Sequence, residues 1–369
     1  MAHICILLPC HWGAARGGAE FQSHLLAEYL IDNSDHTVTF LANRPPERTE
    51  DYRYHVRRFG GPRLPGGLRW GRLPDTLDLL NTLKEVRPQV IVQMVASAYT
   101  GVAAWYAQRT GSHLYWYIAS DMDIAPSPVV GVHGLAEVID RNMFIYGLRH
   151  ANYIIAQTHS QSDVLHRNFG RHADLTIPNF LPYAELNQSK QAGFTVSWIA
   201  NIKKLKRPEL FVDLARACRE TPEIFFRMAG RVADDQLALV IDQATRELPN
   251  FQYLGELSLD GVEAELDKAD VFVNTSDYEG FPNTFIQAWL HAVPVISLNV
   301  DPDGTMARHG IGIRTETMEL MLDQLLELKT DRASLESMGK KAREYAIANH
   351  SLANAAKLCK HFESVLARK

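Results

Sequence analysis

Cysteine is sparse in this sequence, with four residues in 369, and no two of them form a C-x-x-C pair. A disulfide framework or a cysteine-based zinc site needs paired or closely spaced thiols, so both are disfavoured. Cys5, Cys10, Cys218 and Cys359 fit reduced thiols, and we expect a cytoplasmic protein. The fifteen histidines show no H-E-x-x-H pattern or other metal-ligand spacing.

Long hydrophobic runs are also missing. The N-terminal stretch MAHICILLPCHWG has a short apolar run and no basic lead-in, which argues against a signal peptide and favours a first buried strand. Polar residues and a glycine interrupt the weakly polar stretch 90–107, whereas a transmembrane helix needs about 20 predominantly apolar residues. We therefore expect no transmembrane helix.

Positive charge is not in excess, since the formal net charge is −5. A nucleic-acid-binding protein would favour a basic balance, so we expect no nucleic-acid partner. The glycine loop GAARGGAE after the first apolar run lacks the G-x-G-x-x-G spacing. That absence disfavours a nicotinamide-dependent enzyme.

What the sequence does contain is a regular alternation of short apolar runs with amphipathic helical patterns. The runs are HICILLP, HTVTFLA, VIVQMVA, LYWYIAS, YIIAQ and LTIPN, and then FTVSWIA, IFFRMAG, FQYLGE, VFVNTS, VPVISL and IGIR. Near-continuous apolar runs are typical of strands buried on both faces of a parallel sheet. The pattern predicts an α/β protein with two doubly wound, Rossmann-like sheets of about six strands each.

The domain boundary is predicted within residues 177–193, IPNFLPYAELNQSKQAG, which carry two prolines and little periodicity. We assign 1–180 to an N-terminal domain and 181–349 to a C-terminal domain. The last helical pattern, about 350–369, could pack back on the first domain. Ligands of doubly wound sheets bind outside the carboxyl ends of the strands, so two such domains facing each other would form a central cleft.

The stretch SDYEGFPNTFIQAW, Ser276–Trp289, lies at such a strand end, directly after the apolar run VFVN. If a helix begins near Asn283, its first-turn amides have no intrahelical partner and attract phosphate. Gly280 lets a ligand approach the backbone, and Glu279 can accept hydrogen bonds from sugar hydroxyls. The alternative interpretation is a solvated loop acid followed by an ordinary helix cap.

These residues resemble the donor loop of the retaining glycosyltransferases of family 4, which have the GT-B fold of two Rossmann-like domains around a cleft. Other segments similar to motifs of that family follow one another over nearly the whole chain. They are Gly17–Glu20, Ile177–Asn179, Trp198–Pro208, Met228–Arg231 and Tyr253–Glu256. Each motif is weak alone, but their order and spacing together are specific.

The resemblance implies that Glu279 contacts the donor sugar and that Lys206 neutralises the diphosphate, on which charge builds as the glycosidic bond breaks. The backbone of Gly280–Thr284 would hold sugar hydroxyls and the diphosphate. It also implies the donor-binding residues Gly17, Gly18, Asn201, Gly230, Arg231, Leu254, Gly280, Phe281, Pro282, Asn283, Thr284 and Gln287. With these roles, Glu279→Ala should leave the binding of free nucleotide nearly intact. No metal or other cofactor is implied.

The chain departs from the family pattern at three places. Gln287 and Asn201 stand where the family usually has Glu and Arg, and Gln lacks the charge-assisted hydrogen bonds of a carboxylate to the nucleotide ribose. Weaker ribose binding is therefore expected. Many relatives have a histidine near the reacting sugar where this chain has Ser120 and Asp121. Whether either replaces it stays open, and Asp121 is included among the candidate catalytic residues.

Two D-x-D pairs, Asp121–Asp123 and Asp301–Asp303, have the spacing that holds a divalent metal in the other large glycosyltransferase fold. A GT-B enzyme typically uses protein cations and helix ends instead, so we expect no metal at either pair. Pro302 and Gly304 make a turn the simpler interpretation of the second pair.

Residues 44–72 form a basic segment with eight arginines and three acids, interleaved with Leu64, Leu68 and Trp70. Such a segment, extended to Leu73, could contact anionic lipid at the inner face of the membrane, at about 1 kcal/mol per cation near the surface. It could equally bind an acidic or pyrophosphate-linked acceptor, or be a solvated loop.

The function expected from this sequence is transfer of a hexose-type sugar from a nucleotide-diphosphate donor, UDP favoured, to a hydroxyl of a glycan or lipid-linked acceptor. Another GT-B enzyme, such as a nucleotide-sugar epimerase, would need an acid and base pair at the sugar ring. A non-catalytic sugar-nucleotide-binding partner of a polysaccharide assembly system stays open because of Gln287 and Asn201.

Overall fold

The computed structural model describes residues 1–60, 73–126, 135–183, 185–186, 192–221 and 223–368. The chain forms two compact units: an N-terminal unit of residues 1–179 with 352–369, and a C-terminal unit of residues 180–351. The chain therefore crosses twice between the units, at 179/180 and at 351/352. The predicted boundaries were 180/181 and about 350.

The N-terminal unit is built on a seven-stranded parallel sheet with the order β3-β2-β1-β4-β5-β6-β7. The strands are β1 (His3–Cys10), β2 (Thr37–Arg44), β3 (His55–Arg58), β4 (Val90–Met94), β5 (His113–Tyr117), β6 (Tyr153–Ala156) and β7 (Leu175–Thr176). Strands are added outward from β1 in one direction up to β3 and in the other from β4 onward, so the switch point lies between β1 and β4.

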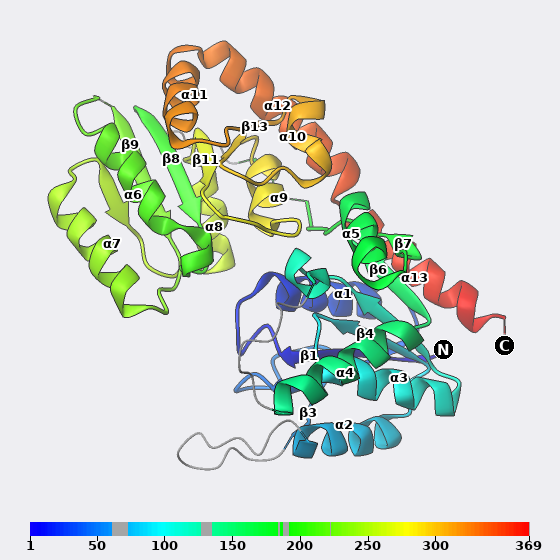
Figure 1. The fold of residues 1–369 in the computed structure, drawn as a ribbon. Coiled ribbons are helices and arrows are strands. Elements are labelled where there is room, and N and C mark those ends of the chain that lie inside the picture. The colour runs from blue at the N-terminus through cyan, green and yellow to red at the C-terminus, as the bar shows by residue number, and fades with distance from the viewer. Residues whose placement is uncertain (61–72, 127–134, 184, 187–191, 222, 369) are drawn as a thin grey trace. The chain divides into compact units, whose positions relative to one another are not determined.

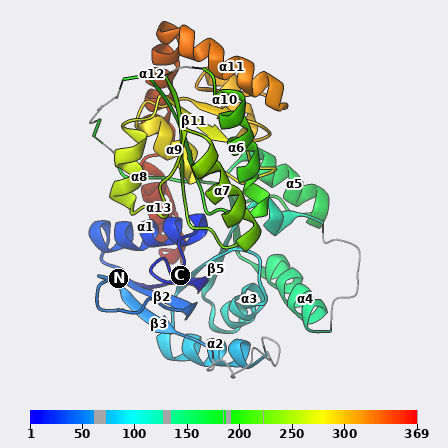
Figure 2. The same ribbon diagram turned by 90° about the vertical axis from the view of Figure 1, so that its left-hand side faces the viewer.

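Helices cover both faces of this sheet (Figures 1 and 2). They are α1 (Gly18–Asn33), α2 (Leu73–Val86), α3 (Ala98–Thr110), η1 (Asp121–Ile124), α4 (Leu135–His150), α5 (His159–Phe169) and α13 (Ala353–Leu366). Side chains of α2, α3 and α4 share one core with the strand residues Cys5, Ile91 and Trp116. On the other face, the Tyr115 ring packs against Phe362 of α13 at 4.7 Å.

Strand β3 is one strand more than the sequence predicted. Its sequence, HVRR, has a single apolar residue, and the strand is largely exposed at the sheet edge. Short, charged edge strands are common because they prevent pairing with other chains. Periodicity therefore gives no signal for β3, which the sequence placed inside the basic segment.

The C-terminal unit contains a six-stranded parallel sheet with the order β10-β9-β8-β11-β12-β13, and all six strands were predicted. The strands are β8 (Phe194–Ile199), β9 (Ile224–Ala229), β10 (Phe251–Tyr253), β11 (Val271–Asn274), β12 (Val295–Ser297) and β13 (Gly312–Arg314). Here the switch point lies between β8 and β11.

The helices of this unit are η2 (Lys204–Lys206), α6 (Pro208–Ala217), α7 (Asp235–Glu247), α8 (Leu259–Leu266), α9 (Asn283–Leu290), η3 (Pro302–Gly304), α10 (Thr305–His309), α11 (Met318–Thr330) and α12 (Arg332–Asn349). Helices α6, α7 and α11 share one core with β8, β9 and β11 (Figure 1). Helix α6 shows why: proline begins it, and Phe211, Leu214 and the C-cap residue Cys218 are buried at helical spacing.

Among the residues that the structure describes, no helix combines the length and the apolar character needed to span a membrane.

Candidate active site

The proposed catalytic residues of the C-terminal unit lie at its switch point. Lys206 ends the short helix η2 in the connection after β8, and Glu279 is in the loop after β11; these two strands are neighbours in the sheet. From this point further strands are added to the sheet in opposite directions. The connections from the two neighbouring strands therefore separate and leave a crevice outside the carboxyl ends of the strands. Two residues 73 positions apart in sequence are thereby brought together.

Lys206 Nζ donates directly to Glu279 Oε1, and the two side chains form an ion pair. The Lys206 side chain is only 19% exposed and that of Glu279 15%, so this pair is more shielded from water than an ordinary surface pair. Ser276 Oγ donates to the same Glu279 oxygen at 2.8 Å. The arrangement is a cation and a carboxylate at a largely buried strand edge.

The backbone of Lys206 is fixed by two buried side chains. Trp198 Nε1 donates to Thr275 Oγ1 at 2.9 Å, and Thr275 Oγ1 donates to the carbonyl oxygen of Lys206 at 2.7 Å. Trp198 is only 2% exposed and belongs to the core of this unit. Its indole also ties the loop after β8 to the loop after β11.

Glu279 is positioned by a buried polar network that sequence reasoning missed. Asn274 Nδ2 donates to Ser276 Oγ at 3.2 Å, and Ser297 Oγ donates to Asn274 Oδ1 at 3.2 Å. All three side chains are buried. The sequence did contain a signal for this network. The apolar run VFV is followed directly by three small polar residues, NTS, at the end of a buried strand.

Helix α9 begins at Asn283, as predicted, but Asn283 is not its cap. Pro282 is the N-cap residue, and no side chain caps the helix. Phe281 is 7% exposed and packs against His350 at 4.5 Å, so its side chain belongs to the core. Phe281 can therefore contribute to ligand binding only through its backbone, as the predicted role of Gly280–Thr284 requires.

Gly230 shapes the loop after β9. Its φ is +145°, and a Cβ at this position would lie 1.8 Å from the carbonyl oxygen of Ala200. Gly230 N donates to Gly255 O at 2.8 Å, and Tyr253 OH donates to Gly230 O at 2.7 Å. These bonds tie the loop after β9 to the loop after β10. Leu254, which follows β10, donates its N–H to Met228 O of β9 at 2.8 Å.

A cavity of about 360 Å³ opens beside this loop. It is lined by Arg231, Val232, Ala238, Ile241, Asp242, Tyr253 and Glu256. It therefore offers an aromatic ring, a guanidinium and two carboxylates at the carboxyl ends of β9 and β10.

Two other cations near Lys206 are paired with other acids. Arg207 bonds Glu209 at 2.6 Å and Asp277 at 3.1 Å, and these bonds raise the Arg207 pKa. Lys204 is 74% exposed and lies 3.7 Å from Asp234. Of these three cations, Lys206 is the one at Glu279. Asn201 lies half-buried just after β8, and Gln287 half-buried on α9.

The remaining candidate residues belong to the N-terminal unit. Gly17 is the N-cap of α1 and Gly18 its first residue, in the loop after β1 at the switch point of that sheet. Asp121 follows β5, is exposed, and accepts a hydrogen bond from Gln161 Nε2 at 3.0 Å. Ser120 caps η1.

The glycine loop of this unit is anchored by a fully buried histidine. His11 Nδ1 accepts from Gly13 N at 3.0 Å, so Nε2 carries the proton and donates to Tyr54 OH at 2.9 Å. The Tyr54 hydroxyl can then donate to His24 Nδ1 at 2.8 Å. Burial lowers the pKa of His11 to about 4, with a smaller effect of His24. His11 therefore stays neutral and holds the loop.

One acid of each D-x-D pair has a structural role. The Asp123 carboxylate accepts from the backbone N–H groups of Ala96, Ala119 and Ser120 at 2.9–3.0 Å. Asp301 accepts from Met306 N at 2.7 Å and holds the start of α10. These bonds fix one acid of each pair to the backbone.

The basic segment is partly paired. Arg53 bonds Asp32 at 2.6 Å and also pairs with Glu28, while Arg57 lies 3.2 Å from Glu85. The predicted contact residues Arg63, Leu64, Leu68, Arg69, Trp70 and Arg72 lie outside the described residues.

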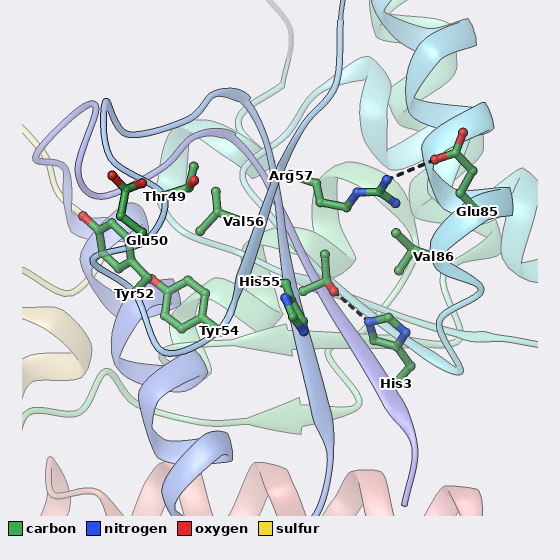
Figure 3. A pocket seen from close by; sticks show the side chains of 11 residues that line it. His3, Thr49, Glu50, Tyr52, Tyr54, His55, Val56, Arg57, Glu85 and Val86 are labelled. Carbon is green, nitrogen blue, oxygen red and sulfur yellow. Dashed lines mark hydrogen bonds and ion pairs between the residues drawn. The ribbon is translucent and has the colours of Figure 1, made fainter.

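A cavity of about 550 Å³ lies on the N-terminal unit (Figure 3). The cavity runs along the edge strand β3, from His3 at the amino end of β1 to Tyr52 and Tyr54 in the loop before β3. The Tyr52 ring lies 4.4 Å from that of His11, which follows the carboxyl end of β1. Its margin carries the Arg57–Glu85 ion pair.

A group of potential metal ligands, His36, Cys359 and Glu363, lies on the same unit with ligand atoms within 4.8 Å of one another. His36 Nδ1 accepts from the N–H of Ala2 at 3.2 Å, so its Nε2 carries the proton. Ligation through Nε2 would move that proton to Nδ1 and direct two N–H groups at each other. The group as arranged does not fit a metal ion.

Comparisons with known proteins agree with this geometry. The family model described as "Glycosyltransferase Family 4" matches residues 16–182, and that described as "Glycosyl transferases group 1" matches residues 193–331. The two matches follow one another along the chain, one in each unit.

Solved structures with a similar fold include HepE from Anabaena in complex with UDP and glucose, 16% identical with a TM-score of 0.77, covering 99% of this chain and 100% of that chain. Sucrose-phosphate synthase from Thermosynechococcus elongatus is 16% identical with a TM-score of 0.77, and both chains are covered completely (100% each). The pneumococcal O-GlcNAc transferase GtfA, in complex with UDP and GlcNAc, is 13% identical with a TM-score of 0.72 and 99% coverage of each chain.

Two parallel Rossmann-like sheets define a protein of the GT-B fold. The glycine loop lies at the switch point of the first sheet, and the Lys206–Glu279 ion pair at that of the second. The two family matches and the fold together show more than the architecture. The chain belongs to family 4 of the glycosyltransferases, as its sequence motifs indicated.

Proposed function

We propose that this glycosyltransferase moves a hexose-type sugar from a UDP-sugar to a hydroxyl of a glycan or lipid-linked acceptor, with retention of the anomeric configuration. The observation that carries the proposal is the pairing of Lys206 with Glu279 at the switch point of the C-terminal sheet. A cation beside a carboxylate matches the two parts of a sugar nucleotide, a charged diphosphate and a ring rich in hydroxyls.

In the proposed donor complex, the Lys206 ammonium contacts the diphosphate, and Glu279 accepts hydrogen bonds from sugar hydroxyls. Charge builds on the diphosphate as the glycosidic bond breaks, and a fixed ammonium stabilises it. The first-turn amides of α9, at Asn283 and Thr284, add partial positive charge. Gln287, on the same helix, would contact the ribose through its amide.

The base is proposed to lie toward the cavity lined by Arg231 and Glu256. UDP is favoured because HepE and GtfA, which share the fold, were both solved with UDP. The cavity supplies a ring and hydrogen-bonding groups for a base, and nothing in its chemistry requires a particular one.

Retention would follow from attack by the acceptor oxygen on the face of the sugar from which the diphosphate leaves. The new C–O bond forms as the bond to phosphate breaks, and the acceptor proton passes to the leaving diphosphate oxygen. This mechanism requires no protein nucleophile. Lys206 and the α9 terminus supply the positive charge, so the reaction is proposed to be independent of metal ions.

The N-terminal unit is proposed to bind the acceptor, with Asp121 or Ser120 near the reacting hydroxyl. Segment 44–73 is proposed to contact a lipid-linked acceptor or the membrane surface. Arg53 and Arg57 pair with acids, which leaves that role mainly to the other arginines of the segment. Closure of the site would exclude water that otherwise hydrolyses the donor.

The test is calorimetric titration of UDP, GDP and ADP into the wild type, Lys206→Ala and the control Lys204→Ala. Lys204 is a nearby lysine that is exposed and directed at Asp234, so its loss should have little effect. We expect UDP to bind selectively and Lys206→Ala to weaken it at least tenfold. Absence of nucleotide binding, in EDTA and in magnesium buffer alike, would refute the donor site. Binding of sugar nucleotide without transfer or hydrolysis would favour the non-catalytic partner instead.

A further inference from the structure

We infer that Glu279 competes with the donor's diphosphate for Lys206, so that the site discriminates against free nucleoside diphosphate in favour of the intact sugar nucleotide. This inference rests on the proposed function. Its starting point is that the two residues assigned to different parts of the donor are bonded to each other in the structure.

Of the two partners, the carboxylate is fixed and the ammonium can move. Glu279 Oε1 is held by Ser276 Oγ, which is itself held by Asn274. Apart from its bond to Glu279, Lys206 is held at its backbone, through Thr275 and Lys203, and carries its charge on a flexible four-carbon stem. A diphosphate entering the site would therefore draw Lys206 away, while Glu279 remains in place.

That exchange leaves a shielded carboxylate without its cation, close to an anionic ligand. Removing one partner of a shielded ion pair is unfavourable, and like charges in proximity disfavour one another. Even if Lys206 contacts both groups at once, the Glu279 charge still opposes the charge of the diphosphate. In either arrangement, with Lys206 displaced or shared, Glu279 weakens the binding of UDP.

The sugar of an intact donor changes this balance. Its hydroxyls would donate to Glu279 and replace the hydrogen bond lost from Lys206, and bonds to a charged acceptor are strong. After transfer the sugar is gone, and the carboxylate again attracts Lys206 away from the remaining UDP. The ion pair thus favours donor binding and product release. It also changes the earlier expectation that loss of Glu279 leaves the binding of free nucleotide intact.

The experiment is calorimetric titration of UDP and UDP-glucose into the wild type, Glu279→Gln and Asp277→Asn. Gln keeps the shape and an oxygen that can accept from Ser276, and it removes only the charge. Asp277→Asn removes an equal charge two residues away, from an acid paired with Arg207 instead.

We expect Glu279→Gln to bind UDP about threefold to thirtyfold more tightly than the wild type, with a smaller gain or a loss for UDP-glucose. Asp277→Asn should leave both affinities within twofold. Unchanged or weaker UDP binding by Glu279→Gln, in a wild type that does bind UDP, would overturn the inference and leave the proposed function standing. An equal gain in affinity for UDP and UDP-glucose would overturn the claim that Glu279 discriminates between the two ligands. A wild type that binds neither ligand would remove the proposed function, and the inference with it.

Discussion

Gly230 is the position at which the loop beside the proposed donor site tolerates an added side chain least. Its φ of +145° is rarely adopted by any other residue, and an alanine Cβ would lie 1.8 Å from the carbonyl oxygen of Ala200. Backbone strain of this kind alone costs about 1–3 kcal/mol. The clash with a strand-end carbonyl adds to it, so we expect Gly230→Ala to destabilise the C-terminal unit by about 3 kcal/mol or more.

Gly255 provides a matched control in the neighbouring loop. It also has a positive φ, +74°, but an added Cβ would meet nothing within 4 Å. Only conformational strain of roughly 1–2 kcal/mol is then expected. In a unit of this size, each kcal/mol shifts the unfolding midpoint by about 2–4 °C. Gly230→Ala should therefore lower the midpoint by about 6–12 °C, and Gly255→Ala by clearly less.

Differential scanning calorimetry of the two variants, followed by titration with UDP, checks this prediction. Gly230→Ala should also weaken UDP binding, because Arg231 and the cavity it lines move with the loop. Equal midpoint shifts for the two variants would refute the steric argument. Unchanged UDP binding by a destabilised Gly230→Ala would refute the link between this loop and the site.

Three further predictions follow from single contacts. Ser276→Ala removes a hydrogen bond to the charged Glu279, worth about 1.5–3 kcal/mol, so kcat/KM for transfer should fall about 10-fold to 150-fold. Circular dichroism should show an intact fold, and a fall in kcat/KM below threefold would contradict the positioning role of Ser276. Gln287→Glu restores a charge-assisted bond to the ribose, so titration with UDP should show severalfold tighter binding, and weaker binding would remove Gln287 from the ribose site. His11 has a folded-state pKa of about 4, below its unfolded value of 6.5, so its contribution to stability is complete above pH 6.5 and is lost as the pH falls to 4. The free energy of unfolding, measured with urea, should fall between pH 7 and pH 4.5 by up to about 3 kcal/mol less in His11→Gln than in the wild type. An equal fall in both proteins would contradict the role of the buried imidazole.

The strands of this protein were predictable because parallel strands buried on both faces are nearly continuous apolar runs. Twelve such runs correspond to twelve strands, and the exception, β3, lies exposed at an edge with the sequence HVRR. Its pairing with β2 depends on backbone hydrogen bonds, which leave no trace in the pattern of side chains. The helix start at Asn283 was also predictable, because proline precedes it and a helical stripe follows.

The contacts within the site were less predictable. Lys206 and Glu279 were each singled out, but only the strand order β8-β11 shows that they meet. Ser276 was overlooked because a serine after a strand is common in loops, and its role depends on where its hydroxyl points. Phe281 stands in the donor motif, and only the structure shows that its ring packs into the core, which leaves its backbone for the predicted role.

The central claim is that this protein transfers a sugar from a nucleotide donor through a site built on Lys206 and Glu279. Incubation with a panel of UDP-hexoses in EDTA, followed by proton NMR, tests it directly through the anomeric configuration of the first-formed product. The account predicts release of UDP and an α-configured product from an α-linked donor, with both signals lost in Glu279→Ala and Lys206→Ala. A β-configured product would contradict retention. Turnover that survives in both variants would contradict the site itself.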